Sequence, residues 1–121
     1  MATLEDAERQ NSHLRSLAAV LFAAAESESS SSWIAAVLDA RFSDQDGSIM
    51  DKVRVEKPDG SVGSISLPTE ATLQLIALGD ARPSGQDRWY GLLLRVTAEG
   101  ACDVRFNYEP SCTDDESFYA S

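Results

Sequence analysis

Two stretches near the C-terminus alternate apolar and polar residues on either side of a short turn. Between Arg88 and Thr97, one face carries the apolar residues Tyr90, Leu92, Leu94 and Val96. The same period of two returns from Cys102 to Glu109, after the turn Ala98–Ala101. A period of two is typical of a β-strand with one buried face, because successive side chains point to opposite sides of a sheet. The two stretches therefore predict an antiparallel hairpin.

Three further strands are predicted upstream of this hairpin, each bounded by residues that favour turns. They cover residues 33–42, 50–57 and 62–67. Asp-Gly pairs lie between them, at 43–48 and 58–61, and such pairs favour tight turns because glycine tolerates positive φ. A meander of three antiparallel strands is the simplest arrangement.

Two helices are predicted where apolar residues recur three and four positions apart. The first covers residues 4–26, and a serine-rich connection at 27–32 follows it. The second is short, opens near Thr69 and closes at Gly79. The sequence therefore predicts an α+β fold, with both helices on one face of a mostly antiparallel sheet of about five strands. We expect the other face to be polar and open.

The length of 121 residues fits one domain, which can bury a core without a metal or disulfides. Within this domain, 1–121, we expect a helix and connection at 1–32, a sheet with the short helix at 33–110, and an acidic tail at 111–121. The N-terminus lacks the basic and apolar runs of a signal peptide, and no apolar stretch approaches the roughly 20 residues that span a bilayer. We therefore expect a cytoplasmic protein.

Acidic residues outnumber basic ones by 20 to 10, which gives a formal net charge of −10. Such a surplus disfavours binding to nucleic acids and anionic membranes, because both attract proteins through Lys and Arg. The expected partner is therefore a neutral or basic protein. The alternative explanation is that the acidity only keeps the protein soluble.

The sequence contains little that could perform a reaction. His13 is the only histidine, and we expect it to be an ordinary exposed residue on the polar side of the first helix. A catalytic Ser-His-Asp or Cys-His set would have to use it, and no serine or cysteine lies in a nucleophile motif. Cys102 and Cys112 are expected to be free thiols, the first a small core residue on a strand and the second in a loop. We predict no catalytic residue, no cofactor and no enzyme activity.

Asp44 and Asp46 are part of an Asp-x-Asp-Gly fragment that also occurs in calcium-binding loops. The bidentate Glu that such a loop places six residues after its glycine is missing. A hairpin turn is therefore the expected structure, and no metal site is predicted.

With these elements assigned, the sequence resembles the YezG-type immunity proteins. Those proteins carry an N-terminal helix, a strand opened by Trp, and a closing Trp-led hairpin that ends in a Phe-x-Tyr-acid pattern. The corresponding residues here are Trp33, Trp89 and Phe106–Glu109. The resemblance spans most of residues 14–110.

The resemblance implies a cytoplasmic antidote to a secreted toxin domain from a polymorphic or contact-dependent competition system. Many such toxins are nucleases with basic surfaces, and an acidic protein can cover such a surface with complementary charge. We therefore expect a 1:1 complex with a cognate toxin, with no nucleic acid and no membrane as partner. The alternative function is a small structural or adaptor domain that forms homodimers through a strand edge. An acid-dependent hydrolase is a third possibility.

The residues expected to contact the partner share one of three places: the open face of the sheet, the first turn, or the acidic tail. They are Trp33, Asp39, Asp44, Asp46, Trp89, Asp103, Asn107, Glu109, Asp114, Asp115 and Glu116, with Phe118 and Tyr119 as further aromatic anchors in the tail. Aromatic residues flanked by acids suit the centre and rim of an interface. The alternative for the two tryptophans is that they close the edges of the sheet or cover its core.

Overall fold

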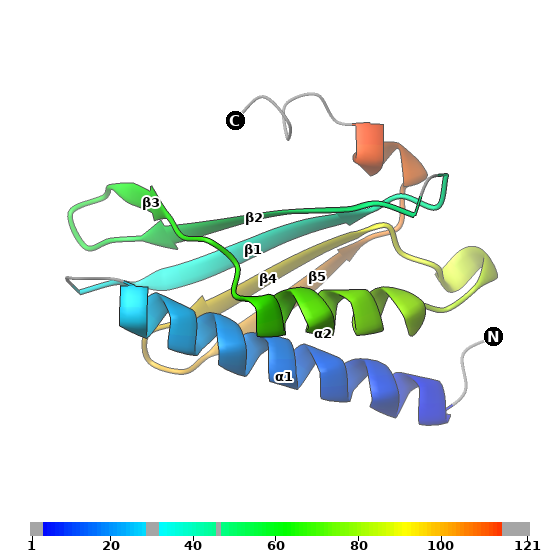
Figure 1. Cartoon of the computed structure of the whole chain (residues 1–121), viewed down its shortest axis with the longest axis horizontal. Coiled ribbons are helices and arrows are strands. Elements are labelled where there is room, and N and C mark those ends of the chain that lie inside the picture. The colour runs from blue at the N-terminus through cyan, green and yellow to red at the C-terminus, as the bar shows by residue number, and fades with distance from the viewer. Residues whose placement is uncertain (1–3, 29–31, 46, 115–121) are drawn as a thin grey trace.

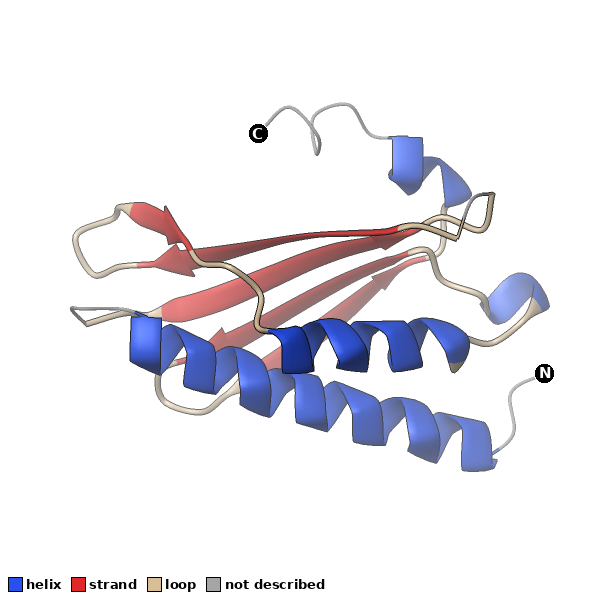
Figure 2. Ribbon diagram, in the orientation of Figure 1, coloured by secondary structure: helices blue, strands red, loops and turns tan. Residues whose placement is uncertain are grey.

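The computed structural model describes residues 4–28, 32–45 and 47–114. The helices α1 (Leu4–Glu28) and α2 (Thr69–Asp80) lie on one face of a five-stranded antiparallel sheet, and among the described residues no helix layer covers the other face (Figure 1). Figure 2 shows the helices and the sheet as two separate layers. The predicted α+β fold is confirmed.

The bounds of the elements follow the predicted ones closely. The helices are α1 (Leu4–Glu28), α2 (Thr69–Asp80) and the short 3-10 helices η1 (Gly85–Asp87) and η2 (Pro110–Asp114). The strands are β1 (Ala35–Phe42), β2 (Ile49–Glu56), β3 (Val62–Ser64), β4 (Gly91–Thr97) and β5 (Cys102–Asn107).

The strands lie in the order β3-β2-β1-β4-β5, and every neighbouring pair is antiparallel. The predicted meander of β1, β2 and β3 and the predicted hairpin of β4 and β5 are both confirmed. The pairing of β1 with β4 joins the two units, and it places Leu38 beside both Val53 and Leu94. The central strand β1 is therefore covered on both edges.

The core lies between the sheet and the two helices. Leu17 and Leu21 of α1 are fully buried, as are Leu75 and Leu78 of α2. Their spacing of three or four positions places each pair on one side of its helix, towards the sheet. Burying such a side chain contributes about 1.5–3 kcal/mol, so these stripes hold the two layers together.

Close approach of α2 to the sheet depends on Gly79. A Cβ atom at this position would lie 3.1 Å from two carbons of the Phe42 ring. The absence of a side chain lets the last turn of α2 rest on the aromatic ring at the end of β1. The sequence predicted Gly79 only as the residue that closes the helix.

Several predicted boundaries differ from the structure, including the end of α1 at Glu28 instead of residue 26 and the end of β5 at Asn107 instead of residue 109. β3 ends at Ser64 instead of residue 67, because the chain leaves the sheet there and reaches α2 through Pro68, which has φ −62° and ψ 152°. β1 and β4 begin two or three residues later than predicted, at Ala35 and Gly91. Part of the expected irregular tail forms η2. The predicted serine-rich connection falls partly on residues 29–31, which lie outside the described residues.

In the part of the chain that the structure describes, no helix has the length and apolar character needed to cross a bilayer.

Candidate functional site

The face of the sheet opposite the helices carries an unexpected excess of basic residues. The strand registers place alternate residues of β1, β2, β4 and β5 on this face, which we call the open face. Its charged residues are Asp39, Arg41, Lys52, Arg54, Glu56, Arg95, Asp103 and Arg105. Five of these eight are basic, in a chain with twice as many acids as bases. The open face is therefore mainly basic, although three of the predicted partner contacts, Asp39, Asp103 and Asn107, are on it.

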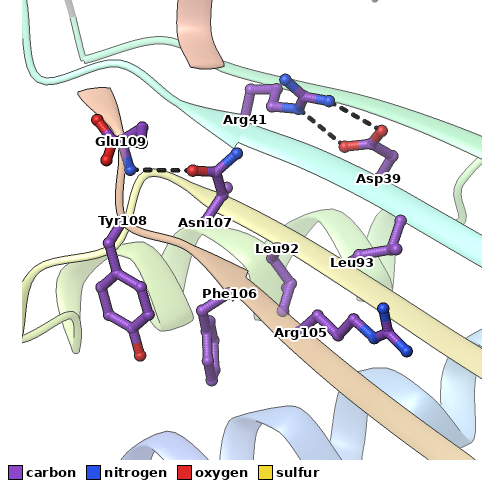
Figure 3. Close-up of a pocket in the computed structure, with 10 residues that line it drawn as sticks. Asp39, Arg41, Leu92, Leu93, Arg105, Phe106, Asn107, Tyr108 and Glu109 are labelled. Atoms are coloured by element: carbon purple, nitrogen blue, oxygen red, sulfur yellow. Dashed lines mark hydrogen bonds and ion pairs between the residues drawn. The ribbon is translucent and has the colours of Figure 1, made fainter. Parts of the chain in front are cut away.

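Asp39 and Arg41 form a two-point ion pair on β1. Arg41 donates from Nε to Oδ1 of Asp39 at 2.9 Å and from Nη2 to Oδ2 at 3.1 Å. The two residues are on the same face because they are two positions apart on a strand. Asp39 was predicted to contact a partner, and here its carboxylate orients the guanidinium of Arg41 (Figure 3).

A second ion pair crosses β1. Arg95 of β4 donates to Glu56 of β2 at 3.2 Å, although the two strands are not neighbours. Glu56 pairs with Ala35 of β1 and Arg95 pairs with Val37, two residues along the same strand, so the two side chains meet diagonally across β1. Ala35 is on the same face and is fully buried.

A hollow of about 440 Å³ opens on this face near the end of β5. Asp39, Arg41, Leu93, Arg105 and Asn107 are among the residues that line it, and Figure 3 shows Leu93 between the Asp39–Arg41 pair and Arg105. The rings of Phe106 and Tyr108 point towards the helix side instead. The hollow therefore combines one exposed leucine with polar and charged groups.

Gly91 lets η2 pack close to this hollow. A Cβ atom there would lie 2.9 Å from Cβ of Asn107 and 3.3 Å from Sγ of Cys112. Nη1 of Arg41 also donates to the carbonyl of Cys112 at 2.8 Å. The start of the predicted acidic tail is thus fixed against the open face.

Asp44 forms a two-arginine cluster in the β1–β2 turn. Arg88 donates to both of its carboxylate oxygens, at 2.6 and 2.8 Å, and Arg82 donates to Oδ1 at 2.9 Å. The hydrogen bond from Arg88 is the main reason that the pKa of Asp44 falls to about 2, with Arg82 adding to the effect. Asp44 was predicted as a partner contact, but its contacts fix the turn to the segment that follows α2.

The two tryptophans do not project from the open face, so this part of the prediction is wrong. Trp33 is 8% exposed and Trp89 is 1% exposed. Trp33 packs edge-on against Phe22 of α1 and donates to Glu26 at 3.0 Å. Both residues precede their strands, so the alternation of the strand does not set their direction. The alternative prediction, that they cover the core, is confirmed.

Trp89 lies at the centre of the aromatic packing. Its ring contacts Phe42 at a centroid distance of 5.1 Å and Phe106 at 4.8 Å, and its Nε1 donates to Gln10 of α1 at 3.1 Å. The guanidinium of Arg82 lies 5.7 Å from the same ring. These contacts join α1, the sheet and the segment that follows α2.

The remaining predicted contacts are dispersed. Asp103 and Asn107 are on the open face, as predicted, and Asp103 forms a 3.6 Å ion pair with Arg105. Glu109 follows β5, and its main-chain N–H donates to Oδ1 of Asn107 at 2.9 Å. The backbone of Asp114 ends η2. Asp46, Asp115, Glu116, Phe118 and Tyr119 lie outside the described residues.

Several carboxylates gather at one end of the molecule, where Figure 1 places the β1–β2 turn, the end of α2, η1 and η2. The exposed acids there are Asp44, Asp80, Asp87 and Glu109, which we call the acidic end. Contacts of Arg82 and Arg88 with Asp44 bring the segment between α2 and β4 to this turn. The sequence did not single out Asp80 or Asp87, because nothing in it shows that their segments meet the turn.

The histidine and the cysteines also differ from the predictions. His13 is half-buried, and its Nδ1 lies 3.1 Å from Oε1 of Gln74, a contact that links α1 to α2. Cys102 is exposed at the start of the edge strand β5, whereas Cys112 belongs to η2 and is buried. Both thiols are free, as predicted. Within the described ranges, no group of three or more His, Cys, Asp or Glu residues could hold a metal ion.

A comparison with known protein families finds no family that matches this chain, and a comparison with curated proteins finds no similar sequence.

Proposed function

We propose that the protein is a non-enzymatic immunity protein that binds a cognate toxin domain and blocks access to its substrate. The observation that carries this proposal is the separation of charge: among the described residues, the strands place three acids on the open face, together with five of the ten Lys and Arg residues of the chain. The other described acids belong to the helices, the turns, the edge of β2 and the segment after β5. A basic partner is attracted to those segments and repelled by the open face.

The acidic end is the proposed contact for a basic toxin. Asp80 and Asp87 are exposed at the end of α2 and in η1, beside the turn that holds Asp44. Asp44 is paired with Arg82 and Arg88, so Asp80, Asp87 and Glu109 provide the main negative charge of this end. The resemblance to YezG-type immunity proteins, the small size and the acidic composition support the same function.

Growth rescue tests the proposal. The test takes as partner the C-terminal domain of any neighbouring reading frame that ends in a variable toxin domain, and this domain is expressed with and without the protein. We expect rescue of growth and a 1:1 complex whose affinity falls as salt is raised. A well-expressed, folded protein that neither rescues growth nor binds the domain contradicts the proposal.

A matched pair of variants tests where the toxin binds. Asp80→Lys/Asp87→Lys reverses two charges at the acidic end, and Glu99→Lys/Asp103→Lys makes the same charge change in the β4–β5 hairpin. All four residues are exposed. We expect the first variant to slow association at least tenfold and the second to have a much smaller effect, because rim charges act mainly on the association rate. Equal effects contradict the acidic end as the contact.

A homodimeric adaptor is the second candidate. The observation that favours it is that β5 forms one edge of the sheet and that β3, at the other edge, is only three residues long. Sheet edges with open backbone groups can pair with another chain. Light scattering over a range of protein concentrations distinguishes the two functions: a stable dimer with no affinity for the toxin domain supports the adaptor.

A further inference from the structure

The outer edge of β2 is only partly covered by β3. The β2–β3 ladder pairs Arg54 with Ser64, Val55 with Gly63 and Glu56 with Val62. The first five residues of β2, 49–53, have no strand on their outer side in the part of the chain that the structure describes. Figure 1 accordingly shows β3 beside one end of β2 only.

The main-chain groups of Ile49 and Asp51 point out of the sheet at this edge. Ser43 donates to the carbonyl of Ser48, so residues of β2 with even numbers bond to β1. Lys57 donates to the carbonyl of Ser61, so residues with odd numbers face the outer side. This alternation is a general property of antiparallel strands. The N–H and C=O groups of Ile49 and Asp51 are therefore available to another strand.

A groove runs along the same edge, between β2 and the connection to α2. It consists of two adjoining hollows of about 610 and 270 Å³, which share Asp51 and Thr72 as lining residues. Ile49, Leu75 and Ile76 line the smaller, more apolar hollow. Ile76 is 47% exposed although it is a large apolar residue. We call the two hollows together the edge groove.

Asp51 is the one carboxylate that lines the edge groove. Its side chain is on the helix side of the sheet, like those of Val53 and Val55. Asp51 is exposed, but partial burial raises its pKa, and among the described residues no hydrogen bond or ion pair reaches its carboxylate. Lys52 and Arg54 also line the larger hollow, but their side chains are on the opposite face of β2 from Asp51. On the helix side of the sheet, Asp51 is therefore the charged residue of the groove that a cation of the partner would meet.

We propose that the edge groove binds an extended segment of a partner protein as an additional antiparallel strand, with a lysine or arginine opposite Asp51. Residues directly opposite each other in such a pair share a face of the sheet. The strand would therefore place an apolar residue opposite Ile49 and an acidic residue opposite Lys52. Backbone hydrogen bonds supply affinity in this binding mode, and the alternating side chains supply specificity.

This inference gives the proposed toxin contact a binding mode, and it rests on the proposed function only for the identity of the partner. The groove includes Gly47 of the β1–β2 turn, so it adjoins the acidic end. A basic toxin attracted to that end would find an open strand edge beside it. The alternative occupant of the groove is a second copy of this chain, which would present its edge strand β5 with Arg105 as the basic residue of that strand.

Two capped peptides of identical composition test the inference on the full-length protein. The first contains Val-Glu-Lys-Thr-Val, which places Lys opposite Asp51 and Glu opposite Lys52 in antiparallel pairing. The second contains Val-Lys-Glu-Thr-Val and reverses both pairs. Titration followed by amide NMR should show slowed hydrogen exchange at Ile49 and Asp51 with the first peptide. Its affinity should be about fivefold higher or more, because two favourable cross-strand pairs replace two like-charge pairs.

Charge-swapped variants give the control. Asp51→Lys/Lys52→Glu should reverse the preference and bind the second peptide more tightly, whereas Glu99→Lys in the distant β4–β5 turn should leave the preference unchanged. Far-ultraviolet circular dichroism checks that each variant is folded. Equal binding of both peptides, or no protection of Ile49 and Asp51 at millimolar peptide, overturns the inference.

The two proposals fail separately. A protein that rescues growth from the toxin but binds neither peptide overturns the edge groove and leaves the immunity function intact. A protein that binds the first peptide selectively but gives no rescue supports the edge groove and contradicts the immunity function.

Discussion

Nη1 of Arg41 donates a 2.8 Å hydrogen bond to the main-chain carbonyl of Cys112, a residue 71 positions away in the sequence. The same guanidinium is held by both carboxylate oxygens of Asp39. Arg41 therefore joins η2 to the middle strand of the sheet. The segment that leads to the acidic tail starts from a fixed position because of this contact.

Replacing Arg41 should loosen η2. Arg41→Ala removes the bond to Cys112 and should lower the free energy of unfolding by about 2 kcal/mol, in the range for hydrogen bonds to charged groups. Urea denaturation measures this loss. The buried thiol of Cys112 should also react faster with a thiol reagent. Arg105→Ala is the control, because Arg105 is 78% exposed and its substitution should change stability by less than about 0.5 kcal/mol.

A methyl group at Gly91 should strain the contact between β4 and η2. Gly91→Ala would bring a Cβ atom to 2.9 Å from Cβ of Asn107 and should cost about 1–3 kcal/mol of stability, as is typical of overpacking. Gly63→Ala is the matched control, since its Cβ would meet only the flexible side chain of Lys57 at 3.7 Å. Thermal unfolding of both variants checks this prediction, and equal melting temperatures would contradict it.

Two Asp→Asn substitutions should have opposite effects on stability. Asp44→Asn removes a carboxylate whose pKa is lowered to about 2 and should destabilise the protein at neutral pH by about 1 kcal/mol, since the pair is exposed. A lowered pKa in the folded state stabilises only above the ordinary carboxyl pKa of about 4, and this contribution is lost as the pH falls towards 2. The difference from the unsubstituted protein should therefore disappear in acid.

Asp51→Asn should instead raise stability at neutral pH. Burial raises the pKa of Asp51, so the charged carboxylate destabilises the folded state above that pKa. The gain should vanish at low pH, where Asp51 is protonated in both the folded and the unfolded chain. Urea denaturation at pH 7 and pH 2 measures both variants, and a loss of stability for Asp51→Asn at pH 7 would show that its carboxylate has a stabilising partner.

Trp89 should behave as a core residue. Trp89→Ala should lower the free energy of unfolding by about 3–5 kcal/mol, because it leaves a cavity between Phe42 and Phe106. Trp89→Phe keeps most of the ring packing but loses the hydrogen bond to Gln10, and should cost less. Denaturant unfolding followed by circular dichroism compares the two variants. If Trp89→Ala keeps the free energy of unfolding of the unsubstituted protein and loses only partner binding, Trp89 is an interface residue instead of a core residue.

The fold class and most of the strands could be predicted from local patterns. Alternation identifies β2 and β5, and Asp-Gly pairs identify the turns, because both signals depend on residues close together in the chain. The same reasoning failed for Trp33 and Trp89. The predicted strands included both residues, but β1 begins at Ala35 and β4 begins at Gly91, so strand alternation does not set the direction of either side chain. Both rings are buried in the core instead.

Charge was the property that local patterns described least well. The sequence by itself determined the net charge of −10 and the two-layer architecture, since both follow from composition and periodicity. Only the tertiary structure decided that β1 lies between β2 and β4, and this pairing brings basic residues from four strands together on one face. It also decided that β3 stops short and leaves Asp51 at an open edge. Which strands become neighbours depends on contacts between distant segments, and no local pattern encodes them.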